Sequence, residues 1–228
     1  MTDDDRLVKA ARRLSEHLTP GDLDHVLRRI TSAAVELLPD VDYASITIQR
    51  GDGTLQTVAP TDDLLCKIDA AQYELQEGPC YEAAVDTVHV FAPHLAEDPR
   101  FPKYAPVAVA SGIEAQAGLR LFDAGGSQGA LNLYAPRAGA FTDIDAVADL
   151  FAHQSAMAIA YAREITQLRE AVVTRQLIGQ AVGVAMERFE LDEARAFGFL
   201  ARLSQDNNVK LREVARRLLE ETTERREP

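Results

Sequence analysis

The sequence predicts an α/β domain with a central antiparallel sheet flanked by helices, which a long helix joins to a small all-α domain of three helices. Two observations lead to this prediction. Apolar residues recur with a helical period at the start of the chain, form short alternating runs in the middle, and return to a helical period in the last third. The 228 residues, 46% of them apolar, suffice for two modest domains, which we place at residues 1–162 and 163–228.

The first expected elements are helices. Residues 4–18 place apolar side chains at spacings of three and four, and Pro20 and Gly21 interrupt that pattern. Asp22 can cap a second helix whose apolar face continues to Leu38. Two helices therefore precede the part of the chain in which the period changes.

Short strands and helices are expected next. Tyr43–Gln49 is β-branched and partly alternating, which is typical of a strand. Turn residues at Gly51–Gly53 let Thr54–Ala59 return as its hairpin partner. The pattern then favours a helix over Asp62–Gln72 and a short helix from Cys80.

The second half of the sheet is expected between Val85 and Tyr134. Val85–Phe91 is predicted to be a strand, and a proline-rich loop follows it as far as Pro106. A short helix is expected over Val107–Ser111. Two further strands, Gln116–Phe122 and Gly129–Tyr134, are separated by turn residues.

The end of the chain is helical. A pattern that opens at Phe141 runs to about Arg188 with few breakers. A second helix is expected after Asp192, a good N-cap, and a third after Asn207 and Asn208. The first of these helices carries no strict heptad, so it could simply connect the domains. We favour pairing of two such helices in a homodimer, because the pattern extends far beyond the sheet domain.

Charge is distributed unevenly along the chain. The net charge is −12, which keeps a protein soluble and repels nucleic acid at long range. Residues 164–228 hold 11 lysines and arginines against 12 acids, whereas the first 163 residues hold 13 against 24. The tail is therefore the part that RNA phosphates could approach without large repulsion.

Several classes of protein are disfavoured. We find no nucleophile–base pair, no paired carboxylates and no metal-ligand spacing, so no enzyme, cofactor or metal site is predicted. No apolar run approaches the roughly 20 residues that span a bilayer. Two cysteines, Cys66 and Cys80, fit a reducing compartment. A cytoplasmic protein without a membrane anchor is expected.

The order of elements over residues 5–162 resembles the GAF family of sensor domains. The matching pieces are the opening hairpin, the segment Glu77-Gly78-Pro79-Cys80, the strand pair around Gly125-Gly126, and the helix entered at Phe141-Thr142-Asp143. This resemblance implies a sensor with a small-molecule ligand, although the signal could equally be a redox change or dimerisation alone. The candidate ligand-pocket residues, which could instead fill the core of the sheet, are Cys80, Tyr81, Phe91, Tyr104 and Tyr134.

The tail resembles the ANTAR family of transcription-antitermination domains. The resemblance rests on a spacing of small, apolar and polar residues: Arg175, Ile178, Gln180, Ala181, Gly183, Met186, Arg188, Ala196, Phe197, Leu200, Leu203, Ser204, Asn208, Lys210, Leu211, Val214 and Ala215. It implies that the tail binds paired hairpins in a nascent leader RNA and contacts their loop bases. Unpaired bases are the part of RNA that proteins recognise most readily by sequence.

The resemblance also implies which residues contact RNA. These are Arg175, Gln180, Ala181, Gly183, Arg188, Ser204, Asn208 and Lys210. Cations would hold phosphates and small residues would let the loop approach, although core packing or a solvated surface explains each position as well. The chain departs from the family at Val182, where a lysine is common, and at Ala185, where leucine is frequent. Loss of that lysine should weaken RNA binding and flatten its salt dependence.

Taken together, these patterns predict an RNA-binding antitermination regulator in which a sensor domain controls the helical tail. A different class of function stays open. The chain could be a ligand-sensing dimeric signalling protein whose tail docks a protein partner, which the acidic composition and the missing lysine would favour. Substitutions at Arg188 and Lys210 separate the two hypotheses, because a tail that docks protein has no RNA affinity to lose.

Overall fold

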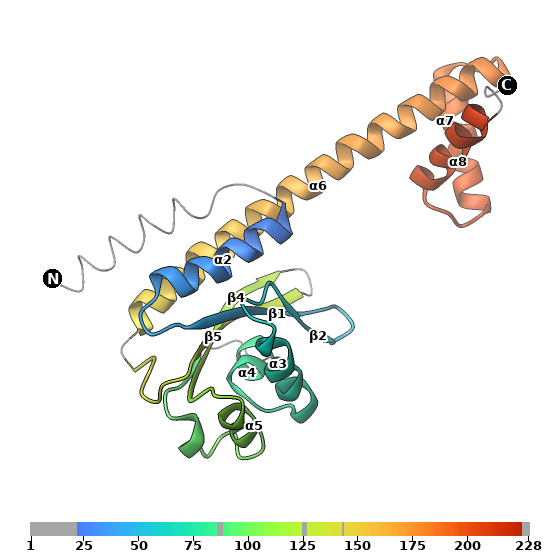
Figure 1. Cartoon of the computed structure of the whole chain (residues 1–228). Helices are drawn as coiled ribbons and strands as arrows, with labels where there is room; N and C mark the ends of the chain where they lie inside the picture. Colours follow the sequence, from blue (N-terminus) through green and yellow to red (C-terminus); the bar gives the residue numbers. More distant parts are fainter. Residues whose placement is uncertain (1–21, 86–88, 125–126, 143, 225–228) are drawn as a thin grey trace. The chain divides into compact units, whose positions relative to one another are not determined.

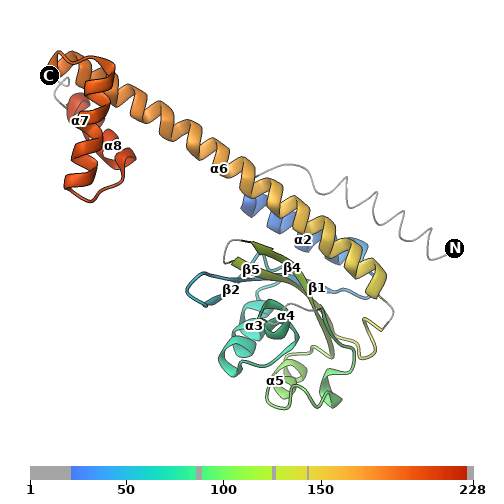
Figure 2. The same cartoon turned by 180° about the vertical axis from the view of Figure 1, so that it is seen from behind.

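The computed structural model of the chain describes residues 22–85, 89–124, 127–142 and 144–224 (Figures 1 and 2). The helix expected over residues 4–18 lies outside the described residues. The chain divides into two compact units, Met1–Arg163 and Glu164–Pro228. The division falls inside one helix, α6, which runs from Asp145 to Phe189.

The first unit contains a five-stranded antiparallel sheet in the order β2-β1-β5-β4-β3. Its strands are β1 (Tyr43–Gln49), β2 (Leu55–Val58), β3 (Val90–Ala92), β4 (Ala115–Ala124) and β5 (Ser127–Ala135). Strands far apart in the sequence meet at its centre, where Ile46 of β1 pairs with Leu131 of β5. The predicted α/β fold with a central antiparallel sheet is therefore confirmed.

Helices cover both faces of this sheet. They are α2 (Leu23–Leu37), α3 (Leu64–Leu75), α4 (Pro79–Val85), α5 (Tyr104–Ala110) and α6, with a 3₁₀ turn at Leu95–Glu97. In Figures 1 and 2, α2 and the beginning of α6 lie against one face, whereas α3, α4 and α5 lie on the other. Asp22 caps α2 as expected, because its carboxylate accepts a hydrogen bond of 2.8 Å from the backbone N–H of His25.

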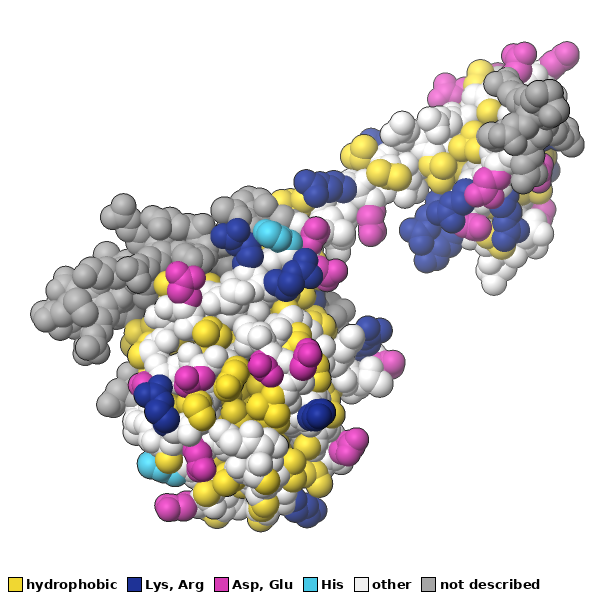
Figure 3. Space-filling model, viewed as in Figure 1, with side chains coloured by type: hydrophobic (Ala, Val, Ile, Leu, Met, Phe, Trp, Pro, Cys, Tyr) yellow, Lys and Arg dark blue, Asp and Glu magenta, His cyan; other side chains and the backbone are white. Residues whose placement is uncertain are grey.

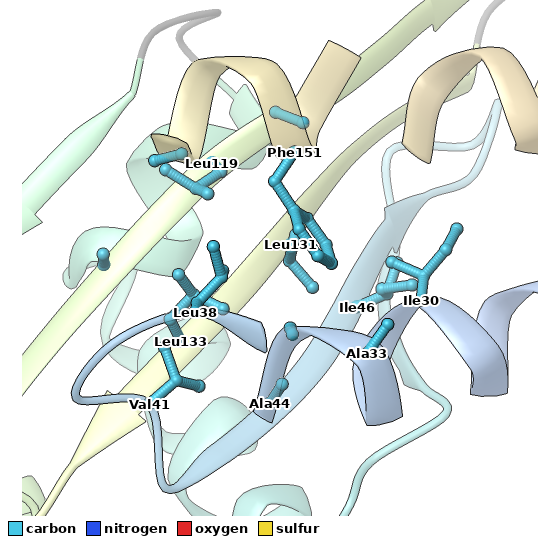
Figure 4. Packing of buried hydrophobic residues seen from close by; sticks show 14 of the residues in the cluster. Ile30, Ala33, Leu38, Val41, Ala44, Ile46, Leu119, Leu131, Leu133 and Phe151 are labelled. Carbon is cyan, nitrogen blue, oxygen red and sulfur yellow. The ribbon is translucent and has the colours of Figure 1, made fainter. Parts of the chain in front are cut away.

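The two faces of the sheet differ in chemistry. On the α2–α6 face the inward side chains are aliphatic or aromatic, and Ile30, Ile46 and Leu131 are completely buried there with Phe151 (Figure 4). On the α3–α4 face the alternate positions carry Ser45, Thr47, Gln116, Asn132 and Tyr134, all of them buried. The α2–α6 face therefore packs on an apolar core, whereas the α3–α4 face combines an apolar cluster around Leu65, Ile68 and Phe101 with a polar interior formed by these strand residues.

Two expected boundaries in the first unit are wrong. Val85, predicted to begin a strand, is the last residue of α4, and β3 begins only at Val90. The short helix expected from Val107 begins earlier, at Tyr104, and includes Pro106. Proline is compatible with the first turn of a helix, where its missing N–H would have no partner in any case.

The second unit is formed by the end of α6 with α7 (Glu193–Asp206) and α8 (Leu211–Glu224). Asp192 caps α7 as predicted and accepts a hydrogen bond from the N–H of Arg195. Asn207 and Asn208 end α7 and do not cap α8. The Asn207 amide donates to the carbonyl of Leu203, and Asn208 adopts a left-handed backbone with φ of 51°. The predicted three-helix tail is confirmed.

Candidate nucleic-acid interface and sensor interior

Small side chains allow the three helices of the tail to pack closely. Its buried core consists of Ala181, Val182, Ala185, Ala196, Leu200 and Ala215. Four of these residues are alanines, so the helix backbones can approach one another and little volume is left for a large side chain. Val182 and Ala185, the two positions at which a departure from the ANTAR pattern was expected, both belong to this core.

The expected RNA contacts differ in their exposure. Arg175, Gln180, Gly183, Arg188, Asn208 and Lys210 are exposed. Ala181 is completely buried, so it acts through packing in this structure. Ser204 is half-buried, and its hydroxyl donates a hydrogen bond of 2.6 Å to the carbonyl of Val209. Ser204 therefore stabilises the α7–α8 turn, in which Asn208 and Lys210 lie.

A first groove, which we call the Phe199 groove, opens among the three helices of the tail and has a volume of about 310 Å³. Arg188 and Phe189 line it from the end of α6, Phe199 from α7, Asn207 from the following turn and Arg217 from α8. The rings of Phe189 and Phe199 are 44% and 37% exposed, and their centroids lie 5.1 Å apart. The groove therefore combines exposed aromatic surface with guanidinium groups.

A second groove, the Arg175 groove, lies between α6, α7 and α8 and measures about 490 Å³. Arg175 and Ile178 line it from α6, Phe197 from α7 and Arg212 from α8. The Phe197 side chain is 47% exposed. The alanine-rich core is consistent with this exposure, because closely packed helices leave little space for an aromatic ring.

The two arginines at the Phe199 groove are held only loosely by acids. The Arg188 guanidinium lies 3.7 Å from Glu221, and that of Arg217 lies 3.7 Å from Glu213. Exposed pairs at such distances contribute little free energy, so a phosphate can compete for the same cations. Figure 3 shows Lys and Arg side chains gathered over the α7–α8 part of the tail, with acidic side chains among them.

In the first unit the polar interior centres on Asp69 of α3, which is completely buried. Its carboxylate accepts hydrogen bonds from the hydroxyls of Ser45 (2.8 Å), Thr57 (3.0 Å) and Tyr134. Burial raises the pKa of Asp69 to about 6, although these hydrogen bonds act in the opposite direction. The hydroxyls of Ser45, Thr57 and Tyr134 and the amide of Gln72, which donate hydrogen bonds to this acid, are all neutral groups.

The polar interior continues to Cys80 at the start of α4. The Gln116 amide donates to the Cys80 sulfur at 2.7 Å, and the Tyr104 hydroxyl donates to the Gln116 carbonyl oxygen at 2.6 Å. Burial raises the pKa of the Cys80 thiol, so its reactive thiolate is disfavoured. Asn132 contributes an amide oxygen that is buried without a hydrogen-bond partner.

The structure brings together three of the five expected pocket residues. Cys80, Tyr104 and Tyr134 are buried in one cluster, with the Cys80 sulfur 3.5 Å from the Tyr134 hydroxyl. Phe91 packs against the apolar core on the opposite face of the sheet, because side chains alternate along β3. Tyr81 is half-buried.

Several site residues were missed by reasoning from sequence. In the first unit they are Ser45, Asp69, Gln72, Gln116 and Asn132; in the tail they are Phe189, Phe199, Arg212 and Arg217. One signal was available for the first group. Polar residues at alternate positions of neighbouring strands mark a common face, as Ser45 and Thr47 do on β1.

Among the described residues, no three or more His, Cys, Asp or Glu side chains form a group able to hold a metal ion. None of the helices in the described part of the chain combines the length and apolar character required to cross a bilayer.

Comparison with protein families finds two matches along the chain. The model of the GAF domain matches residues 21–160, and the model of the ANTAR domain matches residues 166–219. A search of the curated proteins found no match.

Solved structures resemble the first part of the chain in fold. The GAF domain of a phosphoenolpyruvate-protein phosphotransferase from Coxiella burnetii matches with a TM-score of 0.53 and 17% identity, covering 75% of this chain and 99% of that one. An N-acylhomoserine lactone-dependent LuxR-family transcription factor from Burkholderia cenocepacia matches with a TM-score of 0.53 and 16% identity, covering 69% and 96%. At these identities the likeness concerns the fold alone.

Proposed function

Because the chain belongs to the GAF domain family and carries an ANTAR domain behind its GAF domain, we propose that it is a transcription antitermination regulator that binds RNA. A GAF domain is a sensor domain and an ANTAR domain is an RNA-binding antitermination output domain. The proposed target is a pair of hairpins in a nascent leader RNA. Binding would stabilise these hairpins and let the polymerase continue.

One observation carries this proposal above the others. Six of the eight residues expected to contact RNA are exposed on the tail, and they include the cations Arg175, Arg188 and Lys210. Outside the tail the chain is strongly acidic, with 13 basic against 24 acidic side chains in its first 163 residues. The tail is therefore the part of the chain that RNA phosphates could approach without large repulsion.

We also propose that the protein acts as a homodimer through α6. Leu168 and Val172, one helical turn apart on α6, expose their apolar side chains, and such pairs on an unpartnered helix favour association with another helix. Two copies would supply two ANTAR domains for two hairpins. The same surface would serve the alternative in which the tail docks a protein partner.

For the sensor domain we propose a regulatory role in the cytoplasm without catalysis. The polar interior around Asp69, Cys80 and Tyr134 supports binding of a small polar molecule, since it offers buried hydrogen-bonding groups and one unpartnered amide oxygen, on Asn132. Such a ligand would change the packing of α3 and α4 on the sheet and thereby bias the output domain.

Filter binding tests the RNA function. The full chain is titrated against a pool of RNAs with two short hairpins and randomised loops, first at low salt. We expect binding, and the double variant R175Q/K210Q should lower the salt dependence of log K by about two, since each phosphate contact contributes about one.

R202Q is the matched control, because Arg202 is an exposed arginine of α7 that lines neither groove. Its salt dependence should stay close to that of the unmodified chain. Absence of RNA binding by the full chain at low salt would refute the proposed function and leave the protein-docking alternative.

A further inference from the structure

We propose that the Phe199 groove binds a single unpaired RNA base, which stacks on an aromatic ring while the arginines at the rim hold its phosphates. This proposal rests on the proposed function and assigns it a specific site. None of the aromatic residues involved was among the expected RNA contacts.

The exposed rings of Phe189 and Phe199 favour a ligand that covers them. Phe189 and Phe199 are among the largest apolar side chains of the tail, and both remain at its surface. Their centroids lie 5.1 Å apart with the planes tilted by 55°, so the rings touch and do not stack face to face. The Arg188 guanidinium already lies over the Phe189 ring, 5.5 Å from its centroid, whereas the Phe199 ring is 37% exposed. Phe199 therefore offers the stacking surface, since an aromatic face accepts any base by stacking.

The size of the groove favours one base over a peptide helix. A volume of about 310 Å³ lies at the lower end of the range for small-molecule sites. A helical partner would need a row of pockets for side chains at successive turns. The Phe199 groove offers a single hollow between α6, α7 and α8, which suits one planar group.

Charge at the rim favours a nucleotide over a neutral apolar group. Arg188 and Arg217 lie at the groove, each in a loose exposed ion pair with a glutamate. A guanidinium can bind a phosphate through two parallel hydrogen bonds. That contact is stronger than the one each arginine makes with a glutamate at 3.7 Å. A base in the groove would place its own phosphates within reach of these two arginines.

The α7–α8 turn adds groups that can recognise a base edge. Asn207 lines the groove, and it directly precedes Asn208 and lies three positions before Lys210, two of the expected RNA contacts. Amide side chains can hydrogen-bond to the exposed edge of an unstacked base. The groove therefore combines a stacking surface, two cations and an amide on one side of the domain.

Substitution of Phe199 tests the proposal in the full-length protein. RNAs selected from the two-hairpin pool by the unmodified chain serve as the ligand. F199L keeps apolar volume but removes the ring, and we expect it to weaken binding at least about fivefold, the lower limit for loss of base–aromatic stacking. F199W should bind like the unmodified protein, because it keeps a stacking face.

Tryptophan fluorescence provides a direct readout. The chain contains no tryptophan, so F199W carries one fluorophore inside the groove. Its emission should be quenched when the selected RNA binds. In A194W the fluorophore stands on the same helix at an exposed position that lines neither groove, and its emission should stay unchanged.

RNA with abasic loop positions tests whether the groove binds a base. Each loop nucleotide of the selected RNA is replaced in turn by an abasic one. At one loop position, removal of the base should cost F199L much less RNA affinity than it costs the unmodified chain. The reason is that the base and the ring contribute to the same stacking interaction, which F199L has already lost. R217Q, an exposed substitution that should not disturb folding, should lower the salt dependence by about one, whereas R202Q should not.

The outcomes separate this proposal from the function on which it rests. If the unmodified chain binds no RNA, the proposed function fails and the base site fails with it. If the chain binds RNA but F199L and R217Q bind as tightly as the unmodified protein, the function stands and the base site is refuted. Thermal unfolding of each variant, followed by circular dichroism, verifies that the tail is folded.

Discussion

At the scale of single residues, Asp69 is the most unusual group of the sensor domain. A carboxylate is rarely buried without a cation, because removal of its charge from water costs several kcal/mol. Hydroxyl groups of Ser45, Thr57 and Tyr134 offset part of that cost by donating hydrogen bonds. The offset is incomplete, and the pKa of Asp69 is raised to about 6.

This raised pKa predicts a pH-dependent stability of the sensor domain. The unfolded chain loses the Asp69 proton near the ordinary pKa of 3.8, whereas the folded domain keeps it to about 6. Protonation of Asp69 therefore stabilises the folded domain fully below about pH 4, and this stabilisation is lost as the pH rises through 6. A pKa difference of about two corresponds to about 3 kcal/mol.

The variant D69N isolates this effect. Asparagine keeps the shape of the side chain without the charge, so its unfolding free energy should rise relative to the unmodified protein by about 3 kcal/mol between pH 4 and 7. Urea unfolding followed by tyrosine fluorescence measures it, because all six tyrosines lie in the first 163 residues. A difference between the two proteins that stays constant over this pH range would contradict the prediction.

At the scale of elements, the sequence predicted best where local chemistry determines structure. Strand β1 has the predicted limits, and the caps at Asp22 and Asp192 form the predicted hydrogen bonds. The polar interior could not be predicted in the same way. Alternating polar residues such as Thr47 and Asn132 are typical of a strand face in water, and only the later placement of α3 and α4 buries them.

The interface on the tail was predictable in part for a related reason. Exposed cations such as Arg175 and Lys210 follow from the family resemblance, since that pattern includes surface positions. The exposure of Phe197 and Phe199 depends on how closely three helices approach one another across a core that consists mostly of alanine. Helical spacing within one segment contains no information on that distance, so the grooves emerge only from the folded tail.

Close contact between α4 and β4 gives a prediction at the same scale. A Cβ atom added at Gly118 would lie 2.4 Å from the carbonyl oxygen of Pro79 and 2.7 Å from the Cβ of Ala83. Because the first of these is backbone, α4 itself would have to move. We expect G118A to destabilise the sensor domain by about 1–3 kcal/mol, measured by tyrosine fluorescence during urea unfolding.

The matched control for this substitution is G179A. Gly179 lies within α6, and a Cβ added there meets nothing within 4 Å. Alanine should stabilise the helix by about 0.5–1 kcal/mol, because it loses less backbone freedom than glycine on folding. Circular dichroism follows this variant, since the tail contains no tyrosine. A destabilisation by G118A no larger than the measurement error would contradict direct packing of α4 on β4.

At the scale of the whole molecule, the proposed function requires the sensor and the output to be coupled. Helix α6 belongs to both compact units, so a change in the first can reach the second through this helix. A dimer would strengthen such coupling, because two hairpins joined in one RNA meet two linked ANTAR domains. Linked binding events raise affinity by about a hundredfold or more without any new contact.

The surface that would form this dimer can be tested with neighbouring residues of α6. Leu168 and Val172 lie four positions apart and share one side of the helix, whereas Val173 is rotated from Val172 by about 100°. Val172 and Val173 are almost equally exposed, at 66% and 64%. They therefore form a matched pair in which only the direction of the side chain differs.

We expect L168E/V172E to convert a dimer to a monomer, because opposed carboxylates repel one another and glutamate cannot replace the lost apolar contact. L168E/V173E adds the same charge but changes only one residue of the helix side that Leu168 and Val172 share, so it should retain more dimer.

Sedimentation equilibrium measures the assembly, and filter binding compares RNAs with one and with two hairpins. In the monomer the preference for two hairpins should fall at least about tenfold, while affinity for one hairpin stays unchanged. If L168E/V172E remains a dimer, another surface joins the copies, and if it becomes a monomer that still prefers two hairpins, one ANTAR domain must bind both.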